Sequence, residues 1–431
     1  MKVRLVKTAD PAFKPLLAKI LGRRATRSGG VEKRVADILG QVRRRGDRAL
    51  LRYTRLFDHM RLTAATLEVS RDEIDEAVAR VAAGDLRILR FAAKRIQAFH
   101  RRQLQKGWQY RDPLGILLGQ RITPLQRVGV YVPGGKASYP STVLMNAIPA
   151  KVAGVGEIIM TSPVGHNGAI ILAAARVAGV DRIFRVGGAQ AIAALAFGTE
   201  TIPRVDKIVG PGNIFVATAK RLVFGEVNID SIAGPSEILL LADDSADPRH
   251  VAADMLSQAE HDEMAAALCL TTSMKLGQRI QGAIEAQLHG SRRQPITARA
   301  LQSYGAIIVA RSDGEMVQLA DAIAPEHIEL IVRQPQKWAR RIHNAGAMFL
   351  GPYSAPPLGD YLAGPNHVLP TGGSARFFSP LGTYDFLKRT TVIHAEKRAL
   401  RSLAAKITRL ARLEGLHDHA RSVEARFKEH V

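Results

Sequence analysis

Apolar residues return every three or four positions along the first part of the chain, from about residue 13 to residue 105. In the segment VEKRVADILGQVRRRGDRALLRYTRLF, Val31, Val35, Ile38, Leu39 and Val42 fall on one side of a helical projection. A spacing of this kind is typical of amphipathic helices that cover a core with one face. We therefore expect helices from about residue 13 to residue 105, and we call this segment the helical lead-in.

Further along, the pattern changes to short β-branched runs separated by helical segments. The first set of runs lies at 127–132, 157–162, 182–186 and 206–210, and a second set lies at 237–242, 266–272, 306–310, 327–332 and 347–351. Such alternation predicts parallel sheets covered by helices on both faces. The expected fold class is α/β, with two Rossmann-like parallel-sheet domains of similar construction.

The segment from about residue 381 to 431 returns to helical periodicity in KRALRSLAAKITRLARLEGL. It has too few neighbours to form a core alone, so it should dock on another domain or another subunit. We divide the chain into an N-terminal helical segment (1–25), a first α/β domain (26–127 plus 237–380), a second α/β domain (128–236) and a C-terminal helical tail (381–431).

Length and cysteine content narrow the class of protein. The 431 residues, 46% of them apolar, are enough for more than one sizeable core. Cys269 is the single cysteine and lies in an apolar run, so any metal must be held by nitrogen and oxygen ligands. The first residues form no signal peptide, and no run of about 18 apolar residues occurs, so we expect a cytoplasmic protein.

The formal charge of +22 raises the possibility of a nucleic-acid partner. Most of the excess lies in residues 1–110, which hold 26 Lys or Arg against 11 Asp or Glu. Residues such as Arg43, Arg44, Arg45, Arg101 and Arg102 fall within amphipathic helical patterns, where a solvated helix face is the favoured interpretation. A basic surface that holds polyanions weakly at low salt stays open as an alternative.

Two loops after strands carry glycines that suit a phosphate-bearing ligand. The loop after 127–132 begins with Pro133, Gly134 and Gly135, and the loop after 206–210 contains Gly212 and Asn213. Neither segment completes the G-x-G-x-x-G fingerprint, so by themselves they fit ligand-free tight turns equally well.

A metal site is suggested by a Gln-x-x-His pair. Asp247 caps and Pro248 opens a predicted helix in which Gln258 and His261 lie three residues apart, on one face and within reach of one ion. Ordinary polar residues at a helix end are the alternative. Asp360 offers a carboxylate from a loop, and its alternative role is an Asx turn. His419 lies in the tail, where a surface residue is the alternative.

Glu326 and His327 precede the apolar run IELIV. An adjacent acid and imidazole at the mouth of a sheet suit a division of labour, in which the histidine takes an alcohol proton and the carboxylate activates water. A strand-start ion pair is the alternative, because neighbours on a strand point to opposite faces.

The segment NIDSIAGPSEILLLADDSADPRHVAADMLSQAEHDE resembles the signature of the histidinol dehydrogenase family. The similarity continues in the family's order through RVGVYVPGGKASYPSTVLMN, RVGGAQAIAALAFGTE, KIVGPGN, APEHIEL, GDYLAGPNHVLPT and LEGLHDHA, and covers essentially the whole chain.

This resemblance implies a zinc ion, NAD and an intertwined homodimer. It makes Gln258, His261 and Asp360 zinc ligands from one subunit and His419 the ligand from the partner's tail. It makes Tyr131, Gln190 and Asn213 contacts of NAD, which the family binds without the glycine fingerprint. It places the substrate L-histidinol among the zinc ligands, Glu326, His327, Ser236, Tyr361, His367 and Glu414, with Glu414 again from the partner.

The resemblance also implies the chemistry. Two NAD⁺ would oxidise L-histidinol through L-histidinal to L-histidine, the last steps of histidine biosynthesis, with His327 as general base and Glu326 activating water. The alternative within the family is oxidation of another small polar alcohol. The alternative of another class is a non-catalytic polyanion-binding protein. Neither a membrane nor a specific nucleic acid is expected as a partner.

Overall fold

A computed structural model describes residues 2–22, 29–134, 139–165, 168–232 and 234–427. The chain forms two compact units, of which the first comprises residues 1–103 and 125–386 and the second residues 104–124 and 387–431. Gly135 of the first glycine loop lies outside the described residues. Within the described ranges, no helix has the length and apolar character needed to cross a membrane.

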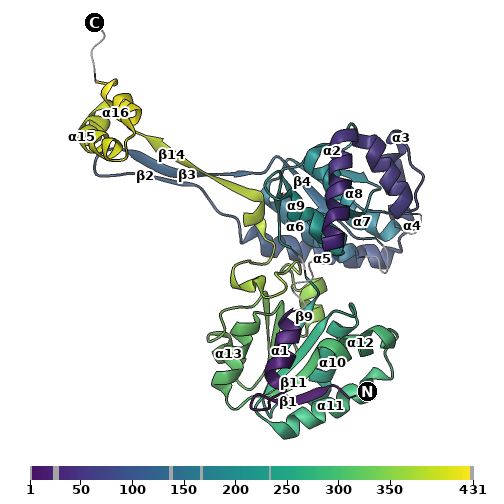
Figure 1. Cartoon of the computed structure of the whole chain (residues 1–431). Coiled ribbons are helices and arrows are strands. Elements are labelled where there is room, and N and C mark those ends of the chain that lie inside the picture. The colour runs from purple at the N-terminus through teal and green to yellow at the C-terminus, as the bar shows by residue number, and fades with distance from the viewer. Residues whose placement is uncertain (1, 23–28, 135–138, 166–167, 233, 428–431) are drawn as a thin grey trace. The chain divides into compact units, whose positions relative to one another are not determined.

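The first unit contains a six-stranded parallel sheet with the order β1-β11-β10-β9-β12-β13 (Figure 1). One face packs on α10, α11 and α12, and the other on α1, α13 and α14. The strands are Arg4–Lys7 (β1), Glu237–Ala242 (β9), Ala266–Thr271 (β10), Gly305–Val309 (β11), His327–Ile331 (β12) and Ala347–Leu350 (β13), and the helices are Phe13–Gly22 (α1), Pro248–Ala259 (α10), Met274–Leu288 (α11), Gln294–Tyr304 (α12), Asp313–Ile323 (α13) and Pro335–Ala339 (α14).

The second sheet of this unit is a five-stranded parallel sheet with the order β6-β5-β4-β7-β8. Because the chain moves from β4 outward to β6 and then returns to the other side of β4, the topological switch point lies between β4 and β7. The elements are Arg127–Tyr131 (β4), Pro140–Ala153 (α6), Glu157–Thr161 (β5), Ala169–Ala178 (α7), Arg182–Phe184 (β6), Gly188–Phe197 (α8), Lys207–Val209 (β7), Ile214–Val223 (α9) and Asn228–Ile229 (β8).

The N-terminal helices cover the five-stranded sheet. Here α2 packs on α8 and α9, α4 packs on α7, and α5 packs on α6. Their bounds are Gly29–Phe57 (α2), Ala64–Leu67 (α3), Arg71–Arg80 (α4) and Ala83–Arg101 (α5). The arginines singled out at 43–45, 101 and 102 are exposed, as expected of solvated helix faces.

These contacts correct the predicted grouping of residues 26–127 with 237–380. The lead-in helices pack on the sheet of residues 127–229, whereas the N-terminal segment, predicted as purely helical, contributes the edge strand β1 to the other sheet. Helical periodicity shows which face of a helix is apolar, but it does not show which sheet that face covers.

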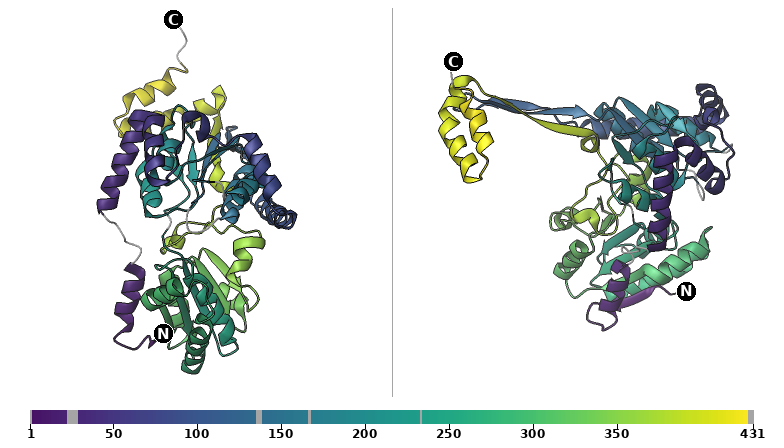
Figure 2. Two further views of the ribbon diagram at one scale, coloured as in Figure 1. Left: turned by 90° about the vertical axis from the view of Figure 1, so that its right-hand side faces the viewer. Right: turned by 45° about the horizontal axis from the view of Figure 1, so that its top comes forward.

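The second unit combines an antiparallel sheet of order β14-β3-β2 with two packed helices. Its elements are Trp108–Arg111 (β2), Leu117–Pro124 (β3), Leu387–His394 (β14), Lys397–Leu413 (α15) and His417–Glu424 (α16). The two yellow helices lie side by side in Figure 2. The tail is therefore not purely helical, because an eight-residue strand precedes α15.

Nearly all strands of the two parallel sheets agree with the runs predicted from the sequence, and the expected α/β class is confirmed. Cys269 lies fully buried in β10, as its apolar surroundings indicated. The short strands β1 and β8 and the antiparallel strands β2, β3 and β14 were not predicted. Of these, β2 (WQYR) and β14 are almost entirely exposed, and β1 and β8 are only four and two residues long, so none gives the long apolar run of a buried strand.

Candidate active site

Glu326 and His327 lie at the amino end of β12, beside the start of β9. His327 is the first residue of β12 and pairs in register with Ile238. This is the opposite end of the sheet from the loops that usually carry ligands in open α/β folds. The helix α10 runs back to this end, so that its last residues come close to the start of β12.

Two hydrogen bonds to Glu237 hold the pair. Oε2 of Glu326 accepts the backbone N–H of Glu237 at 2.9 Å, and Nδ1 of His327 lies 3.3 Å from the carbonyl oxygen of Glu237. A carbonyl oxygen only accepts, so Nδ1 carries the proton in this contact. The two side chains thus face one region, although they are neighbours in the sequence: His327 Nδ1 lies 3.7 Å from Glu326 Oε2.

Burial and charge set the protonation of the pair. Burial raises the pKa of Glu326 to about 7, against the opposing influence of His327. Burial by itself would lower the pKa of His327, but the carboxylates of Glu326 and Asp360 outweigh it and raise that pKa to about 9. An acid with a pKa near neutrality can act as a base or an acid at physiological pH.

Asp360 lies close both to His261, a predicted metal ligand, and to His327, the predicted catalytic histidine. It lies in a short π-helical turn, Leu358–Leu362 (η2), and its Oδ1 is 3.7 Å from Nε2 of His327. Burial tends to raise the pKa of Asp360, but His327, His367 and His261 together hold it below its ordinary value. His367 places Nδ1 2.9 Å from the carbonyl oxygen of Asp360, which leaves its Nε2 as the basic atom.

A cavity of about 480 Å³ opens beside these groups. His327, Asp360 and His367 contribute to its wall, which is otherwise mainly apolar and includes Phe349 and Leu381. Its volume lies within the range of small-molecule sites, roughly 300 to 1,000 Å³. A few convergent polar groups in an apolar cavity are the arrangement expected of a site that orients a small polar substrate.

Gln258 and His261 lie where the sequence predicted them, at the carboxyl end of α10. The side chain of Asp247 accepts the N–H of Arg249 at 2.8 Å and Pro248 is the first helical residue, so the predicted start of this helix is confirmed. The helix ends at Ala259, however, and His261 lies just beyond it. Burial lowers the pKa of His261, which favours the neutral imidazole that binds metals.

The donor set fits a cation. Gln258 is only 3% exposed, and its Nε2 has no hydrogen-bond partner among the described residues. Rotating the amide would place its oxygen there instead, and an amide oxygen, the His261 imidazole and the Asp360 carboxylate are ligand types that zinc accepts. In the described ranges, no three His, Cys, Asp or Glu side chains form a complete metal cluster.

The remaining predicted substrate residues lie in different places. Ser236 directly precedes β9, and its carbonyl oxygen accepts the N–H of Ala266 at 3.0 Å. Tyr361 is 57% exposed beside Asp360. Glu414 and His419 belong to the second compact unit, where Glu414 follows α15, His419 lies in α16 and both are exposed.

Tyr131, Gln190 and Asn213 lie at or beyond the carboxyl ends of three strands of the five-stranded sheet, β4, β6 and β7. Tyr131 ends β4, and its hydroxyl accepts the N–H of Gly188 at 3.1 Å. Gln190 lies in the first turn of α8 and is fully buried. Asn213 caps α9, with Oδ1 accepting the N–H groups of Phe215 and Val216, so only its Nδ2 is left for a ligand.

The loop before Asn213 is held by a buried ion pair that the sequence analysis missed. Lys220 and Asp230 form an ion pair, with side chains 3% and 5% exposed. Lys220 Nζ donates to the carbonyl oxygen of Gly210 at 2.9 Å, and the N–H of Gly210 donates to Asp230 Oδ2 at 2.8 Å. A lysine on the apolar face of IFVATAKRLV was the available signal, because buried lysines are rare unless paired.

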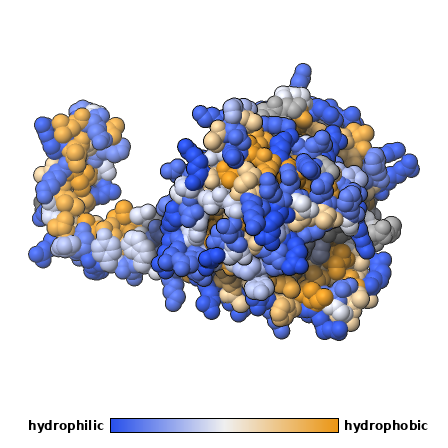
Figure 3. Space-filling model, turned by 90° about the horizontal axis from the view of Figure 1, so that it is seen from below, coloured by the Kyte–Doolittle hydropathy of each residue, from blue (hydrophilic) through white to orange (hydrophobic). Residues whose placement is uncertain are grey.

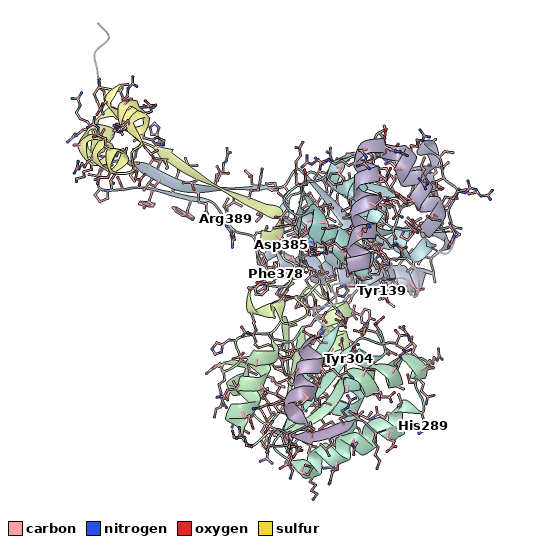
Figure 4. All side chains as sticks on the ribbon, viewed as in Figure 1. Tyr139, His289, Tyr304, Phe378, Asp385 and Arg389 are labelled. Carbon is pink, nitrogen blue, oxygen red and sulfur yellow. The ribbon has the colours of Figure 1, made fainter. Side chains whose placement is uncertain are left out.

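A second buried pair adjoins this one. Lys207 of β7 donates to the carbonyl oxygen of Asp385 at 3.0 Å and to its carboxylate at 3.2 Å. Asp385, labelled in Figure 4, lies in the turn Thr383–Phe386 (η4), and Asp230 is close enough to raise its pKa, after burial itself. Of these two pairs, Lys220 and Asp230 hold the Gly210 loop directly through its backbone N–H and carbonyl oxygen.

Comparison with known proteins places the chain among enzymes of one kind. A sequence profile described as histidinol dehydrogenase matches residues 21–427. A histidinol dehydrogenase of Syntrophotalea carbinolica is 54% identical over 429 residues, which is 99% of this chain and 100% of the relative. One from Geobacter metallireducens is 53% identical over 97% of each chain. The crystal structure of histidinol dehydrogenase from Elizabethkingia anophelis is 34% identical, covers 98% of each chain and has a TM-score of 0.92.

Proposed function

The chain belongs to the histidinol dehydrogenase family, and from this premise we propose that it oxidises L-histidinol through L-histidinal to L-histidine with two NAD⁺. The observation that carries the proposal is the buried pair of Glu326 and His327, held by Glu237 and facing Asp360 beside the cavity. An alcohol oxidation followed by an aldehyde oxidation needs a base for the hydroxyl proton and a second group that activates water.

His327 is the general base in this proposal. Its Nδ1–H is engaged with Glu237, so Nε2 is the atom that accepts the hydroxyl proton. In the described residues Nε2 has no hydrogen-bond partner. Asp360 helps to raise the pKa of His327, so engagement of that carboxylate by a cation would favour the neutral imidazole, which is the form able to take a proton.

Glu326 activates the water of the second oxidation. A pKa of about 7 leaves the carboxyl partly ionised at neutral pH, so the ionised form can take a proton from water. With Oε2 oriented by the N–H of Glu237, the group is held in one position beside His327. The hydrated aldehyde then carries a hydroxyl whose proton His327 accepts in the same way as before.

The family is zinc- and NAD-dependent. Gln258, His261 and Asp360 would hold the metal together with His419 of a partner subunit, and when bound the metal supplies a positive charge that orients the amine and imidazole of the substrate. NAD⁺ supplies the hydride acceptor of both oxidations. Tyr131, Gln190 and Asn213 would contact it, and Ser236, Tyr361, His367 and Glu414 would contact the substrate with the zinc and catalytic residues.

A homodimer completes this proposal. The second compact unit carries Glu414 and His419 on exposed positions, together with exposed Leu410, Leu413 and Leu416. Figure 3 shows apolar surface on this helical unit. Two helices and a three-stranded sheet bury little apolar area alone, so a second copy of the chain is the occupant expected to cover them.

The substrate assignment is tested by steady-state turnover of the zinc-loaded protein with L-histidinol and with other small polar alcohols, including vicinal diols. Preference for L-histidinol by at least about a hundredfold in kcat/KM supports the assignment, since a site built for an imidazole leaves polar groups unpaired with other alcohols. An equal or better rate with an alcohol that lacks the imidazole would reject it.

A further inference from the structure

The carboxylate of Asp58 reaches from the end of α2 to the first turn of α8. Its Oδ2 accepts the backbone N–H of Gly187 at 3.1 Å and the side-chain Nε2 of Gln190 at 3.1 Å. Only the NH₂ group of an amide can donate to a carboxylate, so this contact fixes which way round the Gln190 amide lies. Nε2 faces Asp58, and Oε1 is left as an acceptor.

That acceptor has no donor among the residues that the structure describes. Gln190 has no exposed surface, and in the described ranges Oε1 has no hydrogen-bond partner. A buried carbonyl oxygen without a donor is costly, because it has lost its hydrogen bonds to water. A ligand that brings a donor to this position therefore gains more than an ordinary surface hydrogen bond would give.

Asp58 also occupies the position that an anion could take at the N-terminus of α8. The N-terminus of a helix after a parallel strand commonly binds pyrophosphate through its free N–H groups. Here Gly187 is the N-cap of α8, and its N–H is already donated to Asp58. A phosphate at this helix would meet a carboxylate, so α8 does not offer a phosphate site.

From these contacts we propose that Asp58 is a positioning residue for NAD, holding the Gln190 amide so that Oε1 accepts a hydrogen bond from a donor group of the cofactor. The inference rests on the proposed function, because it takes Tyr131, Gln190 and Asn213 as the cofactor contacts. It adds a residue from the lead-in helix that touches Gln190 but need not touch the cofactor.

A double-mutant cycle tests the proposal. The dissociation constant of NADH is measured by fluorescence on the zinc-loaded full chain for Asp58→Ala, Gln190→Ala and the double variant. Each single substitution is expected to weaken NADH binding by about tenfold, the effect of one buried hydrogen bond. The double variant should bind about as weakly as Gln190→Ala alone, because Asp58 acts through Gln190.

Two conservative variants separate positioning from stability. Asp58→Asn keeps an oxygen that accepts both N–H groups and should bind NADH within about threefold of the wild type, since both bonds reach one oxygen. Asp58→Glu keeps the charge but moves the carboxylate by one methylene, and it should weaken binding as Asp58→Ala does. It also stands in for Asp58→Ala if that variant does not fold.

Asp47 provides the matched control. It is a buried carboxylate on the same helix and accepts a hydrogen bond from the Thr201 hydroxyl, away from Gln190. Asp47→Ala should lower the unfolding midpoint and leave NADH affinity unchanged. Wild-type NADH affinity in Asp58→Ala, or additive losses in the double variant, would overturn the proposal for Asp58.

The proposed NAD site is tested separately from the role of Asp58. Asn213→Ser keeps a capping oxygen but removes the amide donor. If both Asn213→Ser and Gln190→Ala bind NADH as the wild type does, the cofactor site itself is wrong and the proposal for Asp58 falls with it. If these two weaken binding and Asp58→Ala does not, only the proposal for Asp58 is overturned.

Discussion

Nδ1 of His327 lies 3.3 Å from the backbone carbonyl oxygen of Glu237 on the neighbouring strand. The carbonyl fixes the tautomer, so the basic nitrogen is Nε2, which lies 3.7 Å from Oδ1 of Asp360. Since the N–H of the same residue donates to Glu326, a single residue of β9 orients both members of the proposed catalytic pair. The two groups to which we assign separate tasks are thus held by one strand.

Separate substitutions should divide the two oxidations. His327→Asn removes the base of both steps and should slow each by about 10²- to 10⁴-fold. Glu326→Gln removes the group that activates water and should slow L-histidinal oxidation by a similar factor while sparing L-histidinol oxidation. Single-turnover kinetics with L-histidinol and with L-histidinal give the two rates, and equal loss of both steps in Glu326→Gln would refute the division.

Gly210→Ala should disturb the loop before Asn213. Gly210 has φ +111°, and an added Cβ would meet the carbonyl oxygen of Tyr131. Strain and the clash together should lower the free energy of unfolding by at least about 2 kcal/mol and weaken NADH binding. Gly282→Ala is the control, because nothing lies within 4 Å of its added Cβ and its backbone is helical. Unchanged stability and NADH affinity in Gly210→Ala would count against this view of the loop.

The buried Glu329 should give stability a pH dependence. Burial, and then the nearby Asp254, raise the pKa of Glu329 to about 9. The unfolded chain has a value of about 4.3, so between these limits the folded state binds more protons and the free energy of unfolding falls as pH rises, by at most about 1.4 kcal/mol per unit. The Glu329→Gln variant has no ionisable group at this position, so its free energy of unfolding lacks this decrease with rising pH.

Denaturant unfolding at pH 5, 7 and 8.5 measures the difference. Relative to the wild type, Glu329→Gln should become more stable as the pH increases, because the wild-type carboxyl must be kept protonated inside the sheet. If the free energies of unfolding of the two proteins change with pH in the same way, Glu329 is not the protonated group proposed here.

Mixed dimers should show whether His419 acts across the subunit interface. His327→Asn and His419→Ala are each expected to be nearly inactive. If His419 serves the partner's site, a mixed dimer has one site in which both His327 and the partner's His419 are intact. With random pairing, half of the dimers are mixed and each has one active site of two. Co-refolding the two variants should therefore restore up to about a quarter of wild-type activity. If co-refolding restores nothing although mixed dimers form, His419 does not act in trans.

Much of the fold follows from local pattern, because buried parallel strands read as continuous apolar runs. The runs at 237–242 and 266–272 match β9 and β10 within one residue for this reason. The lead-in helices cover a different sheet from the predicted one, and the strand β14 was not predicted, since both depend on which partner a segment meets.

The site residues also fall into those that a local sequence pattern predicts and those that it does not. Gln258 and His261 could be paired from helical spacing, and Glu326 and His327 from adjacency. Asp58, however, acts on a residue 132 positions away in the chain, and Lys220 acts on Gly210 through a carbonyl oxygen. Contacts to the backbone and over long separations leave no periodic signal in a single sequence.

The most direct test of the central claim is the amount of NADH formed per L-histidinol consumed. The zinc-loaded protein is given limiting L-histidinol and excess NAD⁺, the reaction is followed to completion, and a chelator-treated sample serves as the control. We expect two NADH and one L-histidine for each L-histidinol, with no turnover after removal of the metal and full turnover after zinc is added back. A yield of one NADH with aldehyde as the product, or no turnover by folded and metal-loaded protein, would contradict it.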